Sequence, residues 1–326
     1  MAVYTTIDNP ELYFQVKLYT GTGSSNAITL GGSEDMSPNL VWGKGRATGT
    51  NPSIHDSVRG ATKELYTSGT AAEATYAETL KSFDSDGFTV GTDGGWNGSS
   101  QTKVAWCWKE SADAGFDIVG YTGNGSNRTI AHSLSAVPKF IIIKSRDKVD
   151  NWHCYSKTLG ATNIIWLDIT SVTLTSSTFM QDTEPTSSVF SLGTNTATNT
   201  NTFEHIAYCF ADVQGFSKFG SYEGNGNADG AFIYTGFRPA FVMTKSVDST
   251  SAWEMFDNKR EGYNVDNDAL VANATTVEAT ADQIDLLSNG FKLRIATDPN
   301  VAETYIYMAF AEAPFVNSNG VPCNAR

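Results

Sequence analysis

Short runs of hydrophobic residues alternate with polar residues and turn signals along most of the chain. The stretch 116–121 alternates and then meets Gly-Asn-Gly, which is a strong reverse-turn signal. Pro138 precedes a continuous apolar run within 139–144, which is typical of a strand buried on both faces. Such runs recur at about ten-residue spacing, as they do in β-sandwiches and barrels. The pattern therefore predicts an all-β protein.

Four landmarks of this pattern occur three times, in the same order and at nearly constant spacing. They are a Tyr-x-Gly-x-Gly turn, a proline ahead of an apolar strand, a short strand built around a phenylalanine, and a closing strand. The turns start at Tyr19, Tyr121 and Tyr222, the prolines are Pro38, Pro138 and Pro239, the phenylalanines are Phe88, Phe190 and Phe291, and the closing strands are 104–108, 206–210 and 306–310. Each copy is near the commonest domain size of roughly 100 residues. The repeat predicts three tandem homologous β-sandwich modules at 13–110, 115–212 and 215–315, with an N-terminal arm at 1–12 and a C-terminal tail at 316–326.

The segments between the predicted modules, 109–114 and 211–214, are too short to act as flexible linkers. Neighbouring modules are therefore expected to pack against one another, either in a line or as a closed pseudo-threefold ring. Helical patterns are few, and short helical turns are predicted at 57–65, 71–80 and 275–282.

Charge and hydropathy exclude several classes of partner. The net charge is −13 and no run of Lys or Arg occurs, so nucleic acid and anionic membranes are poor partners. No segment approaches the ~20 apolar residues of a membrane span. The opening residues lack the basic start and apolar core of a signal peptide. The chain is therefore expected to be made in the cytoplasm and not to insert into a membrane.

Three motifs that suggest chemistry have simpler interpretations. His55-Asp56-Ser57 places triad residue types side by side, whereas a working triad gathers them from distant positions. Asp84-Ser-Asp-Gly87 resembles the start of a calcium loop but lacks the glutamate that ends one. The Gly-x-Gly turns lack the third glycine and the following helix of a dinucleotide site.

No Cys-x-x-Cys pair occurs, and the cysteines are interpreted as small buried hydrophobic residues. They are Cys107, Cys154, Cys209 and Cys323. We therefore predict no catalytic residue, no metal site, no cofactor and no enzyme activity. A depolymerase with a pair of carboxylates in a groove stays open as an alternative, because the 35 acidic residues offer many pairs.

One residue differs from its counterparts in the repeat. Trp96 lies in the loop 94–100, beside Asp93 and Asn97, where the other copies have no aromatic residue. An aromatic face flanked by a carboxylate and an amide is a plausible platform for a sugar ring. We therefore name these three residues as the candidate ligand-binding site. The alternative is that Trp96 seals a contact with the next module or with another chain.

Several segments of the sequence resemble those of a family of bacteriophage proteins. They are Tyr4–Phe14, Gly87–Gly91, Val104–Lys109, Phe219–Gly226, Tyr234–Met243 and Ala313–Arg326. The family occurs in phages of cyanobacteria and other marine bacteria, usually as a tail-fibre or other virion-surface protein. Its modules look like concanavalin-type or SPRY-like β-sandwiches. The resemblance covers essentially the whole chain and brings no catalytic residues to carry over.

The resemblance implies a structural appendage of the virion, a tail fibre or tail-associated protein that recognises glycans on the host surface. Its implied partners are other virion proteins, a host-surface glycan and further copies of the chain, for instance in a trimer. The alternative is a capsid decoration or collar protein without a host ligand. In that case residues 1–12 would serve as an attachment arm.

Overall fold

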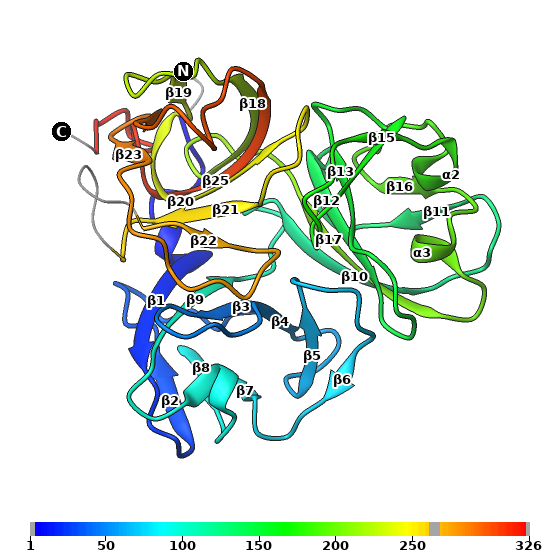
Figure 1. Cartoon of the computed structure of the whole chain (residues 1–326), viewed down its shortest axis with the longest axis horizontal. Coiled ribbons are helices and arrows are strands. Elements are labelled where there is room, and N and C mark those ends of the chain that lie inside the picture. The colour runs from blue at the N-terminus through cyan, green and yellow to red at the C-terminus, as the bar shows by residue number, and fades with distance from the viewer. Residues whose placement is uncertain (1–3, 261–267, 324–326) are drawn as a thin grey trace.

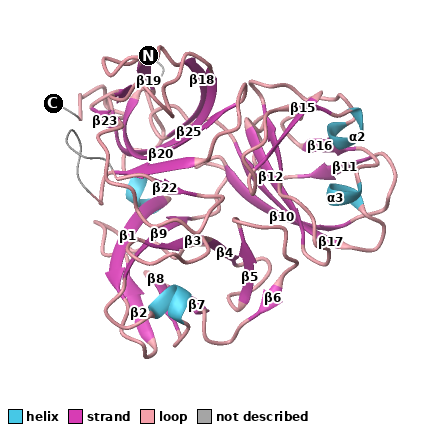
Figure 2. Ribbon diagram, viewed as in Figure 1, coloured by secondary structure: helices cyan, strands magenta, loops and turns pink. Residues whose placement is uncertain are grey.

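The computed structural model describes residues 4–260 and 268–323. Strands make up nearly all of its regular structure (Figure 2). The described helices are the short elements η1 (Pro10–Leu12), α1 (Gly94–Asn97), α2 (Ser177–Met180) and α3 (Thr196–Asn199). The prediction of an all-β sandwich fold is confirmed.

Three large antiparallel sheets form the framework, and each has a small sheet beside it. The first large sheet has the order β1 (Phe14–Thr20), β9 (Thr102–Trp108), β3 (Leu40–Gly45), β4 (Ser53–Asp56), β5 (Lys63–Tyr66), β6 (Ala74–Thr75), and its small sheet is β2 (Asn26–Thr29), β8 (Gly87–Val90), β7 (Leu80–Asp84). The second has the order β10 (Phe116–Thr122), β17 (Glu204–Phe210), β12 (Phe140–Ser145), β13 (His153–Ser156), β14 (Asn163–Trp166), β15 (Leu174–Thr175), with β11 (Arg128–Ala131) and β16 (Val189–Leu192). The third has the order β18 (Ser217–Glu223), β25 (Thr304–Pro314), β20 (Phe237–Ser246), β21 (Glu254–Asp257), β22 (Leu270–Val271), with β19 (Phe232–Tyr234), β24 (Gly290–Leu293) and β23 (Ile284–Leu287).

Over their first five strands the three large sheets follow the same order. In each, the first strand pairs with the last, and the last pairs with the apolar strand near the landmark proline. We call a large sheet together with its small sheet a unit. The homology of the three units stays a prediction, although their strand orders correspond.

The three units lie around a common centre rather than in a line (Figure 1). Aromatic residues from all of them meet there in one hydrophobic cluster. The ring of Phe310 in unit 3 lies 5.2 Å from Phe14 and 5.6 Å from Trp108 of unit 1, between ring centroids. It also lies 5.9 Å from Phe210 of unit 2. Because apolar burial is the main stabilising term in folding, this shared core ties the units into one structure.

Each large sheet is buried on its other face by the small sheet of the same unit. In unit 1, Ile28 and Phe88 of the small sheet cluster with Val41 and Ala105 of the large sheet. Strands β3 and β12 are accordingly buried at every position. This two-sided burial explains why the corresponding sequences read as continuous apolar runs instead of alternating ones.

One recurring backbone contact joins each pair of neighbouring units, and a second joins two of the three pairs. The loop after β12 packs on the segment after β5, where Asp150 N donates to Thr70 O at 3.0 Å and Glu73 N donates to Arg146 O at 2.7 Å. Unit 3 repeats these contacts on unit 2, and unit 1 repeats the second of them on unit 3. The corresponding bonds are Ser251 N to Thr170 O, Thr173 N to Val247 O and Glu278 N to Arg46 O. The ring is therefore closed.

Two of the three junctions also hold networks of charged side chains that are buried or partly buried. Between units 3 and 1, Glu278 accepts hydrogen bonds from Arg46 Nε at 2.9 Å and from Arg260 Nη1 at 3.0 Å. Arg260 in turn donates to Asp257 at 2.7 Å. Between units 1 and 2 the same four places are occupied by Arg146, Glu73, Arg59 and Asp56.

The third junction, between units 2 and 3, is neutral at the corresponding places. Val247, Thr173, Leu159 and Ser156 stand there. Aromatic side chains pack at this junction: the ring centroid of Phe140 lies 6.0 Å from that of Trp253 and 6.4 Å from that of Phe219. The ring thus contains two ionic junctions and one apolar junction.

Both ends of the described chain pack on unit 3. The Tyr4 hydroxyl donates to Gly236 O at 2.8 Å. Asp8 accepts from the backbone N of Ser318 at 2.6 Å. Residues 4–12 of the predicted arm therefore contact the same chain; residues 1–3 lie outside the described part, as do 324–326 of the predicted tail.

The helical turns predicted at 57–65, 71–80 and 275–282 are wrong. The first two ranges contain strands β5 and β6 with turns between them, and the third contains an isolated β-bridge from Ala279 to Ala269. Their backbone groups are used at the junctions instead, as Glu73 N shows. Of the four cysteines, Cys323 is exposed, while the other three are buried as predicted.

Candidate ligand pocket

Asn97 is a structural residue and not a ligand-binding one, which corrects the prediction. It is 0% exposed, and its amide oxygen accepts from Thr22 N at 2.8 Å while its nitrogen donates to Gly91 O at 2.6 Å. Asn199 and Asn300 make the same kinds of bond beside the turns of units 2 and 3. The three asparagines therefore stabilise the repeated Tyr-x-Gly-x-Gly turns through buried hydrogen bonds.

Trp96 does not present an exposed face, so the open platform predicted for it is also wrong. The residue is 3% exposed, and its ring meets His55 edge-on at 4.9 Å. Its indole nitrogen donates to Glu64 Oε1 at 2.8 Å. Gly43 makes this burial feasible, because a Cβ atom at that position would lie 2.4 Å from the indole ring.

Trp96 instead forms one wall of a polar pocket in unit 1. The pocket lies among α1, β5 and the loop that joins β3 to β4, and it has a volume of about 240 Å³. Its lining comprises Gly43, Gly49, Thr50, Asn51, Ser53, Glu64, Tyr66, Asp93, Gly95 and Trp96. We call it the Trp96 pocket. Asp93 and Trp96 thus line one pocket, and Asn97 is not among the lining residues. That Asp93 and Trp96 bind a ligand stays a prediction.

The Trp96 pocket carries negative charge at its base. Burial raises the pKa of Glu64, but hydrogen bonds and charge from His55, with further hydrogen bonds from Trp96 and Ser53, outweigh it and lower the pKa overall. Burial, followed by the nearby Glu64 charge, raises the pKa of Tyr66, so its phenol stays protonated. The lining contains no Lys or Arg. The pocket therefore offers carboxylate acceptors and a phenolic donor in one place.

Asp93 also caps the short helix α1. Its Oδ1 accepts from Gly95 N at 2.8 Å and from Trp96 N at 3.2 Å. This bond fixes the loop that carries the indole. In unit 2, Asn195 makes the corresponding bond to Ala197 N, also at 2.8 Å.

Unit 2 does not repeat the lining of this pocket. Where unit 1 has Gly43 and Glu64, unit 2 has Ile143 and Ile164, and both of these are buried in the hydrophobic cluster of unit 2. The sequence contained one signal that was missed: Gly43 interrupts a buried apolar strand, and such a glycine often marks a close approach by another group.

A family model described as a domain of unknown function, DUF7483, matches residues 9–314. The chain belongs to this DUF7483 family. The matched range spans all three units and the whole Trp96 pocket. No curated protein and no solved structure matches the chain.

The other motifs of this DUF7483 protein serve the framework. Asp56 is buried and accepts from Arg59 and from the Tyr208 hydroxyl of unit 2, so His55-Asp56-Ser57 contributes to a junction. Asp84 accepts from the hydroxyls of Ser82 and Thr89, both at 2.7 Å, within a hairpin. In the described residues, no group of three or more His, Cys, Asp and Glu side chains is placed to hold a metal ion. No described helix is long and apolar enough to span a membrane.

Proposed function

We propose that this DUF7483 protein is a virion-surface protein of a bacteriophage, a tail fibre or tail-associated appendage, which binds glycans of the host surface in the Trp96 pocket. The observation that carries the proposal is the Trp96 pocket of unit 1, which is polar and walled by a tryptophan, whereas unit 2 has buried isoleucines at two of the lining positions. The resemblance to phage appendage proteins supplies the biological setting.

The chemistry of the lining favours a neutral, hydroxyl-rich ligand. Sugar hydroxyls can donate to the ionised Glu64 and to Asp93, and hydrogen bonds to a charged partner are the stronger kind. The Asn51 amide can both donate and accept. An anionic sugar would meet carboxylates and no cation, so acidic glycans are disfavoured.

The lining favours binding over hydrolysis. A glycosidase requires a carboxyl group whose raised pKa lets it act as an acid. Glu64 has a lowered pKa instead, and its Oε1 already accepts a hydrogen bond from the Trp96 indole. The proposal is therefore a lectin-like protein without enzyme activity.

A glycan array with the purified chain tests the proposal, and Asp93→Asn is the informative variant. Unit 2 already has an asparagine at this cap, so the variant keeps the hydrogen bond to the helix and removes only the charge. We expect Asp93→Asn to weaken glycan binding at least about tenfold, which corresponds to losing one charged hydrogen bond. Asp113→Asn is the matched control, because it removes a charge from an exposed position outside the pocket. Equal binding by Asp93→Asn and the unaltered protein would contradict the assignment.

A capsid decoration or collar protein without a host ligand is the second candidate. The observation that favours it is the closed ring of three similar units, a shape that would suit a three-fold position on a particle (Figure 1). Cryo-electron microscopy of intact particles separates the two functions. Density at the tip of a tail appendage supports host binding, whereas density spread over the head lattice supports decoration.

A further inference from the structure

Two aromatic side chains project to solvent from the small sheet of unit 3. Phe232 and Tyr234 of β19 are 47% and 48% exposed, and Ile233 between them is buried. Because side chains alternate across a strand, both rings lie on the outer face of the sheet. Phe232 is the only exposed phenylalanine among the residues that the structure describes. Neighbouring large apolar groups that stay open to water indicate a binding surface.

The other two units do not repeat these rings. In every unit the middle residue of this strand pairs with the landmark phenylalanine, which aligns the three strands. At the two flanking places units 1 and 2 have only small residues, namely Ala27, Thr29, Thr129 and Ala131. Opposite Phe232 stands Lys292, whereas the other units have Thr89 and Ser191. The framework therefore requires neither the rings nor this lysine.

Two lysines flank the rings. Lys218 Nζ lies 5.4 Å from the centre of the Tyr234 ring and donates to Tyr234 O at 2.9 Å. Lys292 pairs with Asp229, whose side chain is 80% exposed, and an ion pair so open to water is weak. Within the described part of the chain Lys218 makes no salt bridge. These three residues sum to one positive charge, in a chain whose net charge is −13.

The rings are held in place before any ligand arrives. The Tyr234 hydroxyl lies 3.2 Å from that of Tyr4. The Phe232 ring lies beside Gly290, where an added Cβ atom would come within 3.1 Å of its Cε2. One side of the Phe232 ring therefore lies against the sheet, and about half of the residue stays in solvent. Side chains that are already ordered lose less entropy on binding.

We propose that this surface, formed by Phe232, Tyr234, Lys218 and Lys292 and called here the β19 face, binds an acidic polysaccharide. The face of an aromatic ring is electron-rich, so it attracts the C–H groups on the flat side of a sugar ring. The two ammonium groups receive the carboxylates of the polymer in charge-assisted hydrogen bonds. Two rings in series along one strand suit a chain of sugars better than a single sugar.

The β19 face goes beyond the function proposed above. It shares no residue with the Trp96 pocket, and its charge is of the opposite sign. It lies on the side of unit 3 that is turned away from units 1 and 2 (Figure 1). The two sites would therefore bind different classes of sugar.

The full chain, immobilised on a biosensor, tests the proposal with polygalacturonate, dextran and single-stranded oligothymidylate as probes. We expect saturable binding of polygalacturonate that weakens as salt is added, and no displacement by dextran. Absence of polygalacturonate binding at low salt would overturn the proposal. Equal binding of oligothymidylate would also overturn it, because the surface would then recognise any polyanion.

The double variant Phe232→Thr with Tyr234→Ala is informative, because unit 2 has these residues at the same places. We expect it to weaken polygalacturonate binding at least about tenfold, since two ring contacts are lost. Lys292→Ser, which also copies unit 2, should weaken binding and reduce its dependence on salt. Binding by the double variant equal to that of the unaltered chain would refute a role for the rings.

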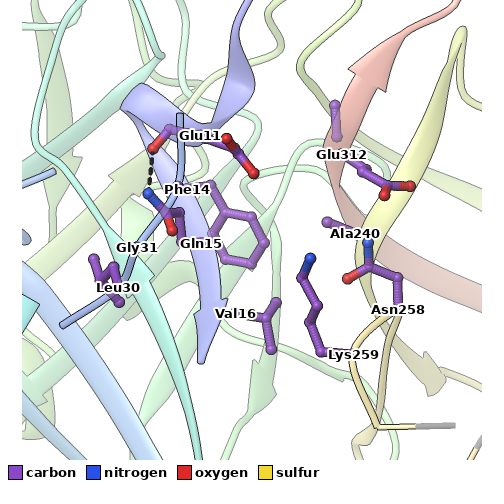
Figure 3. Close-up of a pocket in the computed structure, with 12 residues that line it drawn as sticks. Glu11, Phe14, Gln15, Val16, Leu30, Gly31, Ala240, Asn258, Lys259 and Glu312 are labelled. Carbon is purple, nitrogen blue, oxygen red and sulfur yellow. Dashed lines mark hydrogen bonds between the residues drawn. The ribbon is translucent and has the colours of Figure 1, made fainter. Parts of the chain in front are cut away.

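Lys259→Ser is the matched control for Lys292→Ser. Lys259 is an exposed lysine of the same unit, but it lines a separate pocket of about 80 Å³ between β1 and β20 (Figure 3). Polygalacturonate binding should be unchanged in Lys259→Ser and in Asp93→Asn, so failure of the β19 face and failure of the Trp96 pocket are distinguishable. Equal losses in Lys259→Ser and Lys292→Ser would assign binding to overall charge and refute the site. The comparison of polymers on the unaltered chain stands even if a variant folds poorly.

Discussion

Replacing Glu278 by glutamine should weaken the junction between units 3 and 1. Glu278 lies between two arginines, Arg46 from unit 1 and Arg260 from unit 3. Glutamine has the same shape, but it removes the charge that both guanidinium groups face. The two arginines would then repel each other across the junction.

The size of the effect follows from the burial of the three side chains. Removing one partner of a fully buried ion pair costs about 3–5 kcal/mol. Arg260 is 0% exposed but keeps Asp257, while Glu278 and Arg46 are 13% and 17% exposed at their side chains. Partial exposure and the remaining carboxylate both reduce the cost. We therefore expect Glu278→Gln to lower the free energy of unfolding by about 2–3 kcal/mol.

Urea unfolding followed by tryptophan fluorescence and far-UV circular dichroism measures this change. Glu78→Gln is the control, since it makes the same substitution in the exposed pair with Lys81, and it should leave the midpoint unchanged. The pair Arg46→Val with Glu278→Thr copies the neutral junction, and should lose less stability than the sum of the single changes by about 1–2 kcal/mol. A loss below about 0.5 kcal/mol for Glu278→Gln would refute the idea that this charge holds the ring closed.

Three further outcomes follow from the described contacts. Gly43→Ile should lower the free energy of unfolding by about 1–3 kcal/mol, because its side chain must displace Trp96, and an unchanged thermal melt would contradict the tight contact. Asn199→Ala removes a buried amide that donates to two carbonyls at 2.7 Å, and urea titration should show a loss of about 1–3 kcal/mol. Burial, and then the charge of Asp298, raises the pKa of Glu254 from 4.5 to about 7. The native state thus holds a proton that the unfolded state releases, so this residue makes stability fall as pH rises from 4.5 to about 7. Glu254→Gln should therefore stabilise the protein at about pH 8 and change little at about pH 5, and an equal shift in the unfolding midpoint at both values would count against this sign.

The repeated part of the fold could be predicted from the sequence because its causes are local. Gly23 and Gly125 have positive φ values of 72° and 68°, which the turn requires and glycine supplies. The apolar run 139–144 became β12 because each of its faces has a sheet or core to bury it. Each of these signals involves only a few neighbouring residues.

The junctions could not be predicted in the same way, because their partners are far apart in the chain. Arg46 and Glu278 are separated by 232 residues, and no local pattern links them. The alanine-rich stretch 71–80 shows the effect on secondary structure. It has the composition of a helix, but the contact between Glu73 and Arg146 fixes it in an extended form.

Only part of the candidate site could be predicted from the sequence, for a related reason. The sequence marked Trp96 as unusual, but its exposure depended on what occupies the neighbouring strand. Gly43 supplies the space, and Glu64 supplies the acceptor for the indole. Both lie on other strands of the sheet, so the aromatic residue faces inward and the pocket opens beside it.

The contact between Asp8 and Ser318 brings together residues from near the two ends of the chain. A closed ring whose ends meet has no preferred starting unit, because every junction is made by side chains and backbone rather than by the connecting peptide. A circular permutant that begins at Phe116 and links Asp8 to Ser318 through a short glycine-rich segment would keep all three junctions. Such a permutant would change the order in which the units are synthesised without changing how they pack.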